Sequence, residues 1–283
     1  MRRFLVAAIL FLSFSRLAVA SGHGPVFGAS TPTLGKGGWQ LDQAWFGRLA
    51  DTPQSEEQRL RTMISFGITE DLQVSGSVPI MLVNSFFMPM GRMVATMSSE
   101  NEVEGLVAWR FHRHPTGAGS RFESTVTGGV GLPLERYRPD GMQAAASASF
   151  SAATGYISRS HYAWIGGGYT HHDQRGNDHM GDVAFVSAVY GYRPPALRLD
   201  YPKPDLRFFV EAMGERTERG LHHGFELITS GGTAVFVGPT VLLLYKAYGL
   251  EGGMLFPVYQ DTNFGPKERF RFAANFSYFF WRK

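Results

Sequence analysis

Histidine and aspartate residues gather in one predicted loop, so metal binding is the first chemistry that the chain suggests. The cluster comprises His171, His172, Asp173, Asp178 and His179, and a histidine pair, His222 and His223, lies in another predicted loop. Imidazole nitrogen and carboxylate oxygen are suitable ligands for Zn²⁺ or Cu²⁺. The spacing matches no established metal-site motif, and a polar surface loop is the alternative interpretation.

Residues arranged for catalysis are harder to find. Ser160 and His161 are adjacent, but neighbours on a strand point to opposite faces and cannot form a nucleophile–base pair. The sequence has no G-x-S-x-G, H-E-x-x-H or phosphate-loop motif, and the glycines at 166–168 indicate close packing or twist within a strand. The absence of cysteine excludes thiol nucleophiles, thiolate metal sites and disulfides. We therefore expect no enzymatic activity, no catalytic residues and no cofactor.

Charged residues recur at alternate positions of several apolar stretches, opposite in phase to the aromatic residues. An Arg or Lys facing lipid at the bilayer midplane would cost about 2–4 kcal/mol, so this phase assigns the charges to the lumen or rims of a barrel. The lumen candidates are Arg59, Arg61, Glu102, Glu104, Arg110, Arg207, Glu211, Arg269 and Arg271. They predict either a mixed-charge pore lining or a narrow lumen filled by ion pairs.

The alternation is clearest in residues 269–281. One face carries Phe270, Phe272, Ala274, Phe276, Tyr278 and Phe280, and the other carries Arg269, Arg271, Ala273, Asn275, Ser277 and Phe279. Strands of soluble sheets usually have about 5–6 residues, whereas a tilted strand needs about 9–11 to cross a bilayer. The stretch therefore predicts the closing strand of an outer-membrane β-barrel, although a soluble sandwich strand is the alternative for this stretch alone.

The phase of this strand predicts the effect of two substitutions. If Phe270 and Phe272 face lipid, Arg271 must face inward. If the lumen conducts, Arg271→Glu would then shift ion selectivity toward cations and leave folding nearly intact. Phe272→Arg would place a charge against hydrocarbon and impair insertion.

Eleven further stretches complete a barrel, and no segment after residue 20 has a helical pattern. The predicted strands cover residues 39–48, 59–68, 72–80, 102–112, 121–132, 143–156, 161–170, 182–193, 206–215, 233–246, 248–259 and 269–281. Short turns alternate with long loops, as in bacterial barrels, where the short turns are periplasmic. We predict an all-β, transmembrane, antiparallel up-and-down barrel of about 12 strands, with 10 to 14 compatible with the weaker stretches.

The first residues predict export. Met1-Arg2-Arg3 is followed by an apolar run to Phe14 and by Ala18-Val19-Ala20, which together form a secretory signal peptide at 1–20. Its removal takes three arginines from the 27 basic residues, leaving 24 to balance the 24 acidic ones. A neutral mature chain argues against nucleic acid as a partner. We predict a periplasmic N-terminal lead at 21–38 and the barrel at 39–283.

Three stretches resemble a known family. Residues 35–42 (GKGGWQLD), 66–79 (FGITEDLQVSGSVP) and 250–260 (LEGGMLFPVYQ) are similar to the outer-membrane "transporter" group of phenol-degradation MetA-pathway proteins. The resemblance implies a barrel that passes small molecules, and it carries no catalytic motif onto this chain.

The sequence thus predicts a channel or transporter for small solutes in the outer membrane of a Gram-negative bacterium, with passive passage through a mixed-charge lumen. Its expected partners are outer-membrane lipid, an unidentified small-molecule solute and the barrel-assembly machinery, which reads the C-terminal strand. The alternative is a surface barrel with a closed lumen that acts in metal binding or adhesion through its His-rich external loops.

Overall fold

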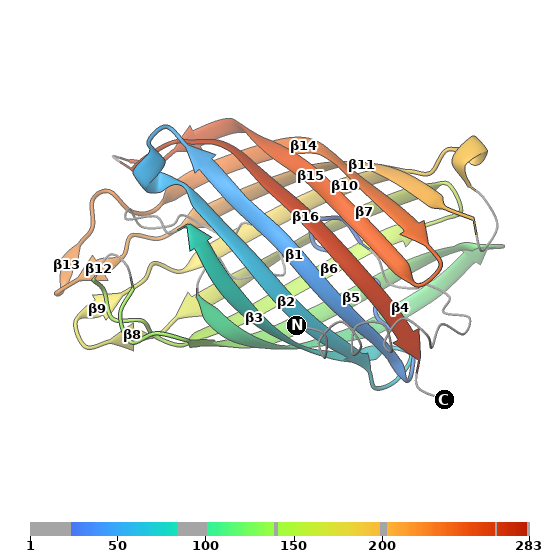
Figure 1. The fold of residues 1–283 in the computed structure, drawn as a ribbon, viewed down its shortest axis with the longest axis horizontal. Helices are drawn as coiled ribbons and strands as arrows, with labels where there is room; N and C mark the ends of the chain where they lie inside the picture. The colour runs from blue at the N-terminus through green and yellow to red at the C-terminus, as the bar shows by residue number, and fades with distance from the viewer. Residues whose placement is uncertain (1–23, 84–100, 139–140, 199–202, 264, 282–283) are drawn as a thin grey trace, which may run out of the picture.

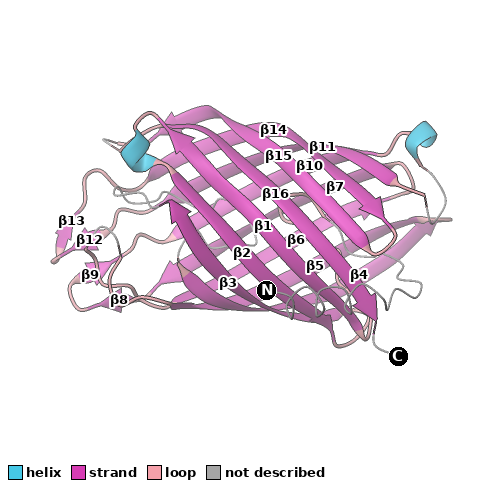
Figure 2. Ribbon diagram, viewed as in Figure 1, coloured by secondary structure: helices cyan, strands magenta, loops and turns pink. Residues whose placement is uncertain are grey.

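Twelve antiparallel strands form a closed barrel in the computed structural model, which confirms the predicted fold class (Figures 1 and 2). The structure describes residues 24–83, 101–138, 141–198, 203–263 and 265–281, so the predicted signal peptide lies outside the described residues. The barrel strands are β1 (Gly38–Ala50), β2 (Glu57–Gly67), β3 (Leu72–Val83), β4 (Glu102–Gly117), β5 (Ser120–Pro133), β6 (Ser147–Ile157), β7 (His161–His172), β10 (Val183–Tyr192), β11 (Asp205–Thr217), β14 (Gly232–Tyr245), β15 (Tyr248–Asp261) and β16 (Glu268–Trp281).

The first and last strands close the barrel. β1 pairs with β16 in register from Gly38 opposite Trp281 to Leu49 opposite Phe270, so no strand edge is left open. Two short 3-10 helices, η1 (Pro53–Ser55) and η2 (Pro195–Leu197), lie in connections. Among the described residues, no helix is long and apolar enough to cross a bilayer.

Side chains alternate between the inside and the outside of the barrel, as the period of two requires. β10 is the most regular case, because buried and exposed residues alternate along all of its residues. Exposed Val186 and Tyr190 lie on its outer face, while Phe185 and Val189 are buried inside. Large apolar side chains such as Trp109 and Phe276 are exposed on the outer wall of other strands, as expected for a surface that faces lipid.

The two ends of the barrel differ. At one end, which we call the short-turn end, the connections are 68–71, 118–119, 158–160, 193–204 and 246–247, and β1 begins and β16 ends there. At the long-loop end the connections are 51–56, 84–101, 134–146, 173–182, 218–231 and 262–267. This asymmetry agrees with the predicted alternation of short turns and long loops.

A small sheet outside the barrel joins two of the long connections (Figure 1). It contains β8 (Gln174–Arg175), β9 (Asp178–His179), β12 (Leu221–His222) and β13 (Phe225–Glu226), in the order β13-β12-β9-β8. Leu221 pairs with His179, so residues 173–182 and 218–231 are held side by side. The sequence predicted the two loops, but not their pairing.

Candidate functional site

Residues 24–36, which we call the plug segment, run inside the barrel. The backbone N–H groups of Val26, Phe27 and Gly28 donate to the Glu211 carboxylate over 2.8, 2.8 and 2.7 Å. Glu211 lies near the middle of β11, where it also accepts a hydrogen bond from Thr240. The sequence predicted a periplasmic lead at 21–38, and the structure places Val26, Phe27 and Gly28 of this stretch inside the barrel, beside Glu211.

Apolar contacts also hold the plug segment in place. Val26 and Phe27 are buried in a cluster with the inward-facing Phe46, Met213 and Phe236. The wall is shaped for close approach, because a Cβ on Gly166 would lie 2.7 Å from the Ala29 Cβ atom. Gly166 is one of the three consecutive glycines that indicated close packing, and it packs against the plug segment.

The rest of the plug segment is bonded to the wall on its way to the short-turn end. Thr31 accepts a hydrogen bond from the Trp164 indole over 3.0 Å, and its carbonyl accepts one from the Thr125 hydroxyl over 2.6 Å. Leu34 N donates to the Gln73 side chain over 2.8 Å. The segment is therefore anchored at several heights of the lumen.

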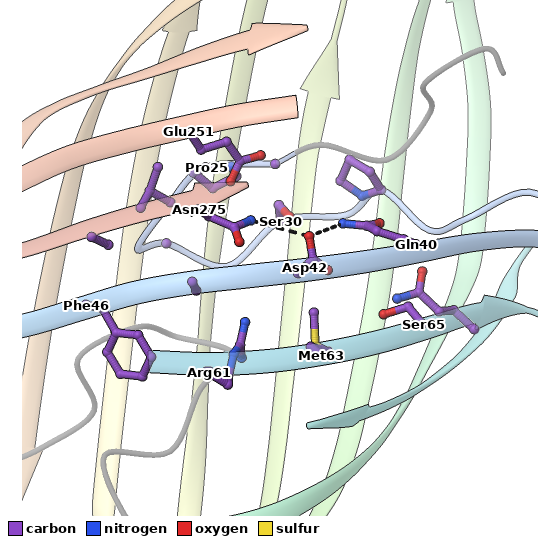
Figure 3. A pocket seen from close by; sticks show the side chains of 17 residues that line it. Pro25, Ser30, Gln40, Asp42, Phe46, Arg61, Met63, Ser65, Glu251 and Asn275 are labelled. Atoms are coloured by element: carbon purple, nitrogen blue, oxygen red, sulfur yellow. Dashed lines mark hydrogen bonds between the residues drawn. The ribbon is translucent and has the colours of Figure 1, made fainter. Parts of the chain in front are cut away.

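A cavity of about 140 Å³ remains between the plug segment and one side of the barrel wall (Figure 3). Its wall comes from β1, β2, β3, β15 and β16, and its other side comes from Gly24, Pro25, Val26, Gly28, Ser30 and Pro32. This volume is well above the roughly 30 Å³ that one water molecule occupies in the liquid. The cavity can hold several waters or a small solute.

Some residues that line this cavity carry buried polar atoms without hydrogen-bond partners. Among the described residues, Arg61 Nε and Nη1, Asp42 Oδ2 and Asn275 Oδ1 are buried and make no hydrogen bond. The other Asp42 oxygen, Oδ1, accepts hydrogen bonds from Gln40 and Asn275, as Figure 3 shows. A buried polar atom left unpaired costs about 1–3 kcal/mol, so these groups reduce the stability of the barrel around the cavity.

A network of ion pairs crosses the lumen near the long-loop end. Arg271 binds Glu215 and Glu268, and its guanidinium lies 3.8 Å from the centre of the Phe236 ring. Arg48 lies 2.9 Å from Glu57 and 3.5 Å from Glu268, and Arg59 also binds Glu57. Three arginines thus balance three glutamates, all of them buried. The sequence predicted either a mixed-charge lining or filling by ion pairs, and at this end of the lumen the six charged residues pair with one another.

Two smaller groups of charges lie near the short-turn end. Arg110 bonds Asp71 over 2.8 Å and Glu123 over 3.2 Å, linking β4 to the turn after β2 and to β5. Arg207 and Arg193 both bind Asp205, and Arg207 also stacks over the Tyr162 ring at 5.1 Å. The lumen is therefore lined by paired charges at both ends, with the cavity between them.

The predicted lumen residues divide into those that are buried and two that are not. Buried residues are Arg59, Arg61, Glu102, Glu104, Arg110, Glu211 and Arg271. Arg207 is partly buried, whereas Arg269 is exposed. The pairing of β1 and β16 shifts between Leu49 and Ala50, so Glu268 follows Phe270 as the next paired residue and Arg269 is bulged out.

The histidine-rich loops contain two groups whose ligand atoms lie within 4.8 Å of one another. The His171 cluster comprises His171, His179 and Asp182, and the Asp178 cluster comprises Asp178, His222 and His223. His172 and Asp173, predicted with them, lie beside the first cluster: the His172 ring faces the Gly181 carbonyl, and Asp173 lies 3.7 Å from His171. Asp178 and His179 are adjacent on β9, and they contribute to different clusters.

Both aspartates are held in the charged form. Burial opposes ionisation of Asp178, but hydrogen bonds from the N–H groups of Gln143 and His223 and from His222 outweigh it and lower its pKa. Burial likewise opposes ionisation of Asp182, and donation from Tyr169, His171 and the His172 N–H lowers its pKa. Each carboxylate therefore presents negative charge to the histidines around it.

Several residues of the lumen were not predicted from the sequence. Ser187 and Trp164 take part in the plug contacts, although no motif marks them. One feature of the sequence could have indicated the plug segment. Val26 and Phe27 are apolar within an otherwise polar stretch, and a segment exposed to solvent does not need apolar residues.

Ser160 and His161, which are adjacent in the sequence, have separate partners. Arg198 donates to the Ser160 hydroxyl, and the His161 ring bonds the Tyr190 hydroxyl.

No protein-family model matches the chain, and no curated protein matches it. Among solved structures, the COG4313 outer membrane channel from Pseudomonas putida F1 is similar, with a TM-score of 0.66 and 11% identity over 90% of this chain and 100% of that one. The NanC porin has a TM-score of 0.51 at 9% identity, over 86% of this chain and 100% of that one. LpxR from Salmonella typhimurium has a TM-score of 0.50 at 8% identity, over 85% and 100%. At these identities the similarity establishes a shared fold, that of bacterial outer-membrane barrels.

Proposed function

We propose that the protein is a passive channel for small polar solutes in the bacterial outer membrane. The observation that carries this proposal is the cavity beside the plug segment, which is lined by charged and polar residues that include Arg61, Asp42, Glu251 and Asn275. An interior that only closed the barrel would gain stability from apolar or fully paired side chains, because unpaired buried groups cost free energy. A wet, mixed-charge interior is instead what selective passage requires.

The fold similarity to a COG4313 outer membrane channel and to the NanC porin supports this proposal. Export by the predicted signal peptide, a Gram-negative source, insertion into outer-membrane lipid with help from the barrel-assembly machinery, and membership of the phenol-degradation MetA-pathway group are parts of the same proposal. We assign the barrel no catalytic role.

The plug segment and the ion pairs limit which solutes can pass. The cavity volume of about 140 Å³ suits molecules of a few heavy atoms rather than oligomers. Asp42 and Glu104 supply negative charge near Arg61. Arg61 is thus the positive group beside the cavity, and its charge should set the balance between anions and cations.

Single-channel recording of the refolded mature protein tests the proposal. We expect discrete conductance steps, and we expect Arg61→Gln to shift the reversal potential in a salt gradient toward cation preference, because Asp42 and Glu251 then face the cavity without it. Arg269→Gln is the matched control, since it removes one exposed arginine and should leave the reversal potential unchanged. A folded protein that passes no current would overturn the proposal and favour the closed-lumen alternative.

A further inference from the structure

The His171 cluster brings three ligands, two imidazoles and one carboxylate, together from separate elements at the long-loop end. His171 lies at the end of β7, His179 lies on β9, and Asp182 lies just before β10. His171 Nδ1 is 2.8 Å from Asp182 Oδ2, and His179 Nε2 is 3.6 Å from Asp182 Oδ1. In a tetrahedral Zn²⁺ site with bonds of about 2.0–2.1 Å, ligand atoms stand about 3.4 Å apart. The two separations run to different oxygens of Asp182, and one ligand atom from each of the three residues lies within 4.8 Å of the other two, which is close enough to converge on one ion after small side-chain shifts.

The surroundings orient the Asp182 carboxylate. The Tyr169 hydroxyl donates to its Oδ2 over 2.5 Å, and the His172 N–H donates to its Oδ1 over 2.9 Å. Such hydrogen bonds around a ligating carboxylate are the usual outer shell of metal sites. Asp173 Oδ1 lies 3.7 Å from the Nε2 atom of His171, which adds a second carboxylate at the edge of the cluster.

The cluster is also open to the outside medium. Asp182 is nearly buried, with 8% of its side chain exposed, whereas 54% of the His171 side chain is exposed. An ion can therefore enter from the solvent and retain one water ligand, as in zinc sites with three protein ligands. Two imidazoles and one carboxylate favour a borderline ion over Ca²⁺ or Mg²⁺, which prefer oxygen ligands.

The Asp178 cluster differs because its carboxylate already accepts hydrogen bonds that connect three loops. Asp178 Oδ2 accepts the Gln143 N–H over 2.9 Å, and its Oδ1 accepts the His223 N–H over 2.8 Å and the His222 ring over 3.1 Å. It thereby ties together residues from three long connections, and both of its histidines come from one tight turn in which His223 has a positive φ of 52°. These contacts account for the residues without an ion.

We propose that His171, His179 and Asp182 form a binding site for Zn²⁺ on the outer side of the barrel. The ion would link the end of β7 to the small sheet and to the start of β10. The site is separate from the lumen, and it does not depend on whether the barrel conducts.

Isothermal titration of the refolded, metal-free protein with Zn²⁺ at pH 7.5 tests the site. We expect saturable binding of one ion that is lost or weakened by more than about tenfold in the His171→Ala/His179→Ala variant. His112→Ala/His114→Ala removes a histidine pair near the short-turn end, and it should leave binding unchanged. His222→Ala/His223→Ala should also retain the ion held by the His171 cluster.

His171→Gln provides a milder variant, because glutamine can still donate a hydrogen bond to Asp182. It should fold with the same heat-modifiable gel migration as the unmodified protein and still bind Zn²⁺ more weakly. The proposal is overturned if the unmodified protein binds no Zn²⁺, or if the His171→Ala/His179→Ala variant binds it with unchanged affinity and stoichiometry. It is also overturned if the binding disappears only when His222 and His223 are replaced.

Discussion

Arg271 shows how a single residue in the lumen can be essential to the fold rather than to selectivity. Its guanidinium binds two glutamates, Glu215 and Glu268, and none of the side chain is exposed. Breaking a buried ion pair from one side leaves the partner charges uncompensated, at a cost of about 3–5 kcal/mol. The prediction that Arg271→Glu would only alter selectivity is therefore revised by its environment.

We expect Arg271→Glu to prevent folding or lower its yield sharply, because it would place three carboxylates together. Arg271→Met should also destabilise the barrel, whereas Glu215→Gln, which keeps Arg271 paired with Glu268, should cost less. Urea titrations of the refolded proteins in liposomes, followed by tryptophan fluorescence, measure the order of stability of these variants. Equal stability of Arg271→Glu and the unmodified protein would contradict this account of the network.

At the scale of the element, β16 carries the inner and outer faces that the alternation predicted, except at Arg269 near its start. Phe270, Phe272 and Phe276 lie on the outer face, and Phe272 packs edge-on against Trp45 at 4.9 Å. Opposite them, Arg271, Ala273 and Ser277 are buried. The bulge at Arg269 breaks the alternation at one point, so Arg269 lies outside the set that faces inward.

Substitutions along β16 should follow this observed phase. Phe272→Arg is expected to impair insertion by about 2–4 kcal/mol if it lies near the midplane, because it exposes a charge to lipid. Arg269→Glu should fold and insert normally, since the bulge leaves that side chain exposed near the rim. Folded yield in liposomes compares them, with Phe272→Leu as the control for loss of the ring. Normal insertion of Phe272→Arg would reverse the assignment of the faces.

At the scale of the whole molecule, the barrel and the plug segment form one interior. Glu211 holds three consecutive N–H groups of the segment, and Phe27 is completely buried among residues of the wall. The open space inside the barrel therefore depends on how residues 24–36 pack as well as on the number of strands. Removing the Glu211 carboxylate should therefore change the conductance more than substitutions on the outer surface do.

We expect Glu211→Ala to increase the conductance or the frequency of large openings. The substitution leaves three N–H groups without their acceptor, each at about 1–3 kcal/mol, so the plug segment should leave its position more often. Deleting residues 24–34 should give a larger and steadier conductance, and Thr240→Val, which removes one hydrogen bond to Glu211, should have a smaller effect. Unchanged current after the deletion would show that the segment does not limit passage.

The sequence by itself determined a barrel of about 12 strands and, for most inward and outward residues, the face on which each lies. These features follow from a local rule, because a strand turns successive side chains to opposite sides and lipid excludes charge from one of them. The twelve stretches, the asymmetric ends and the burial of Arg61, Glu211 and Arg271 could all be read in this way.

Only the tertiary structure decided what the inward residues contact. Glu211 and Val26 are 185 positions apart, and His179 meets Leu221 through a sheet made from two separate loops. The periodicity of the sequence does not indicate such contacts, because they depend on the closure of the barrel and on the shape of the space inside it. The same holds for Arg269, whose exposure results from a shift of one residue in the pairing of β1 with β16.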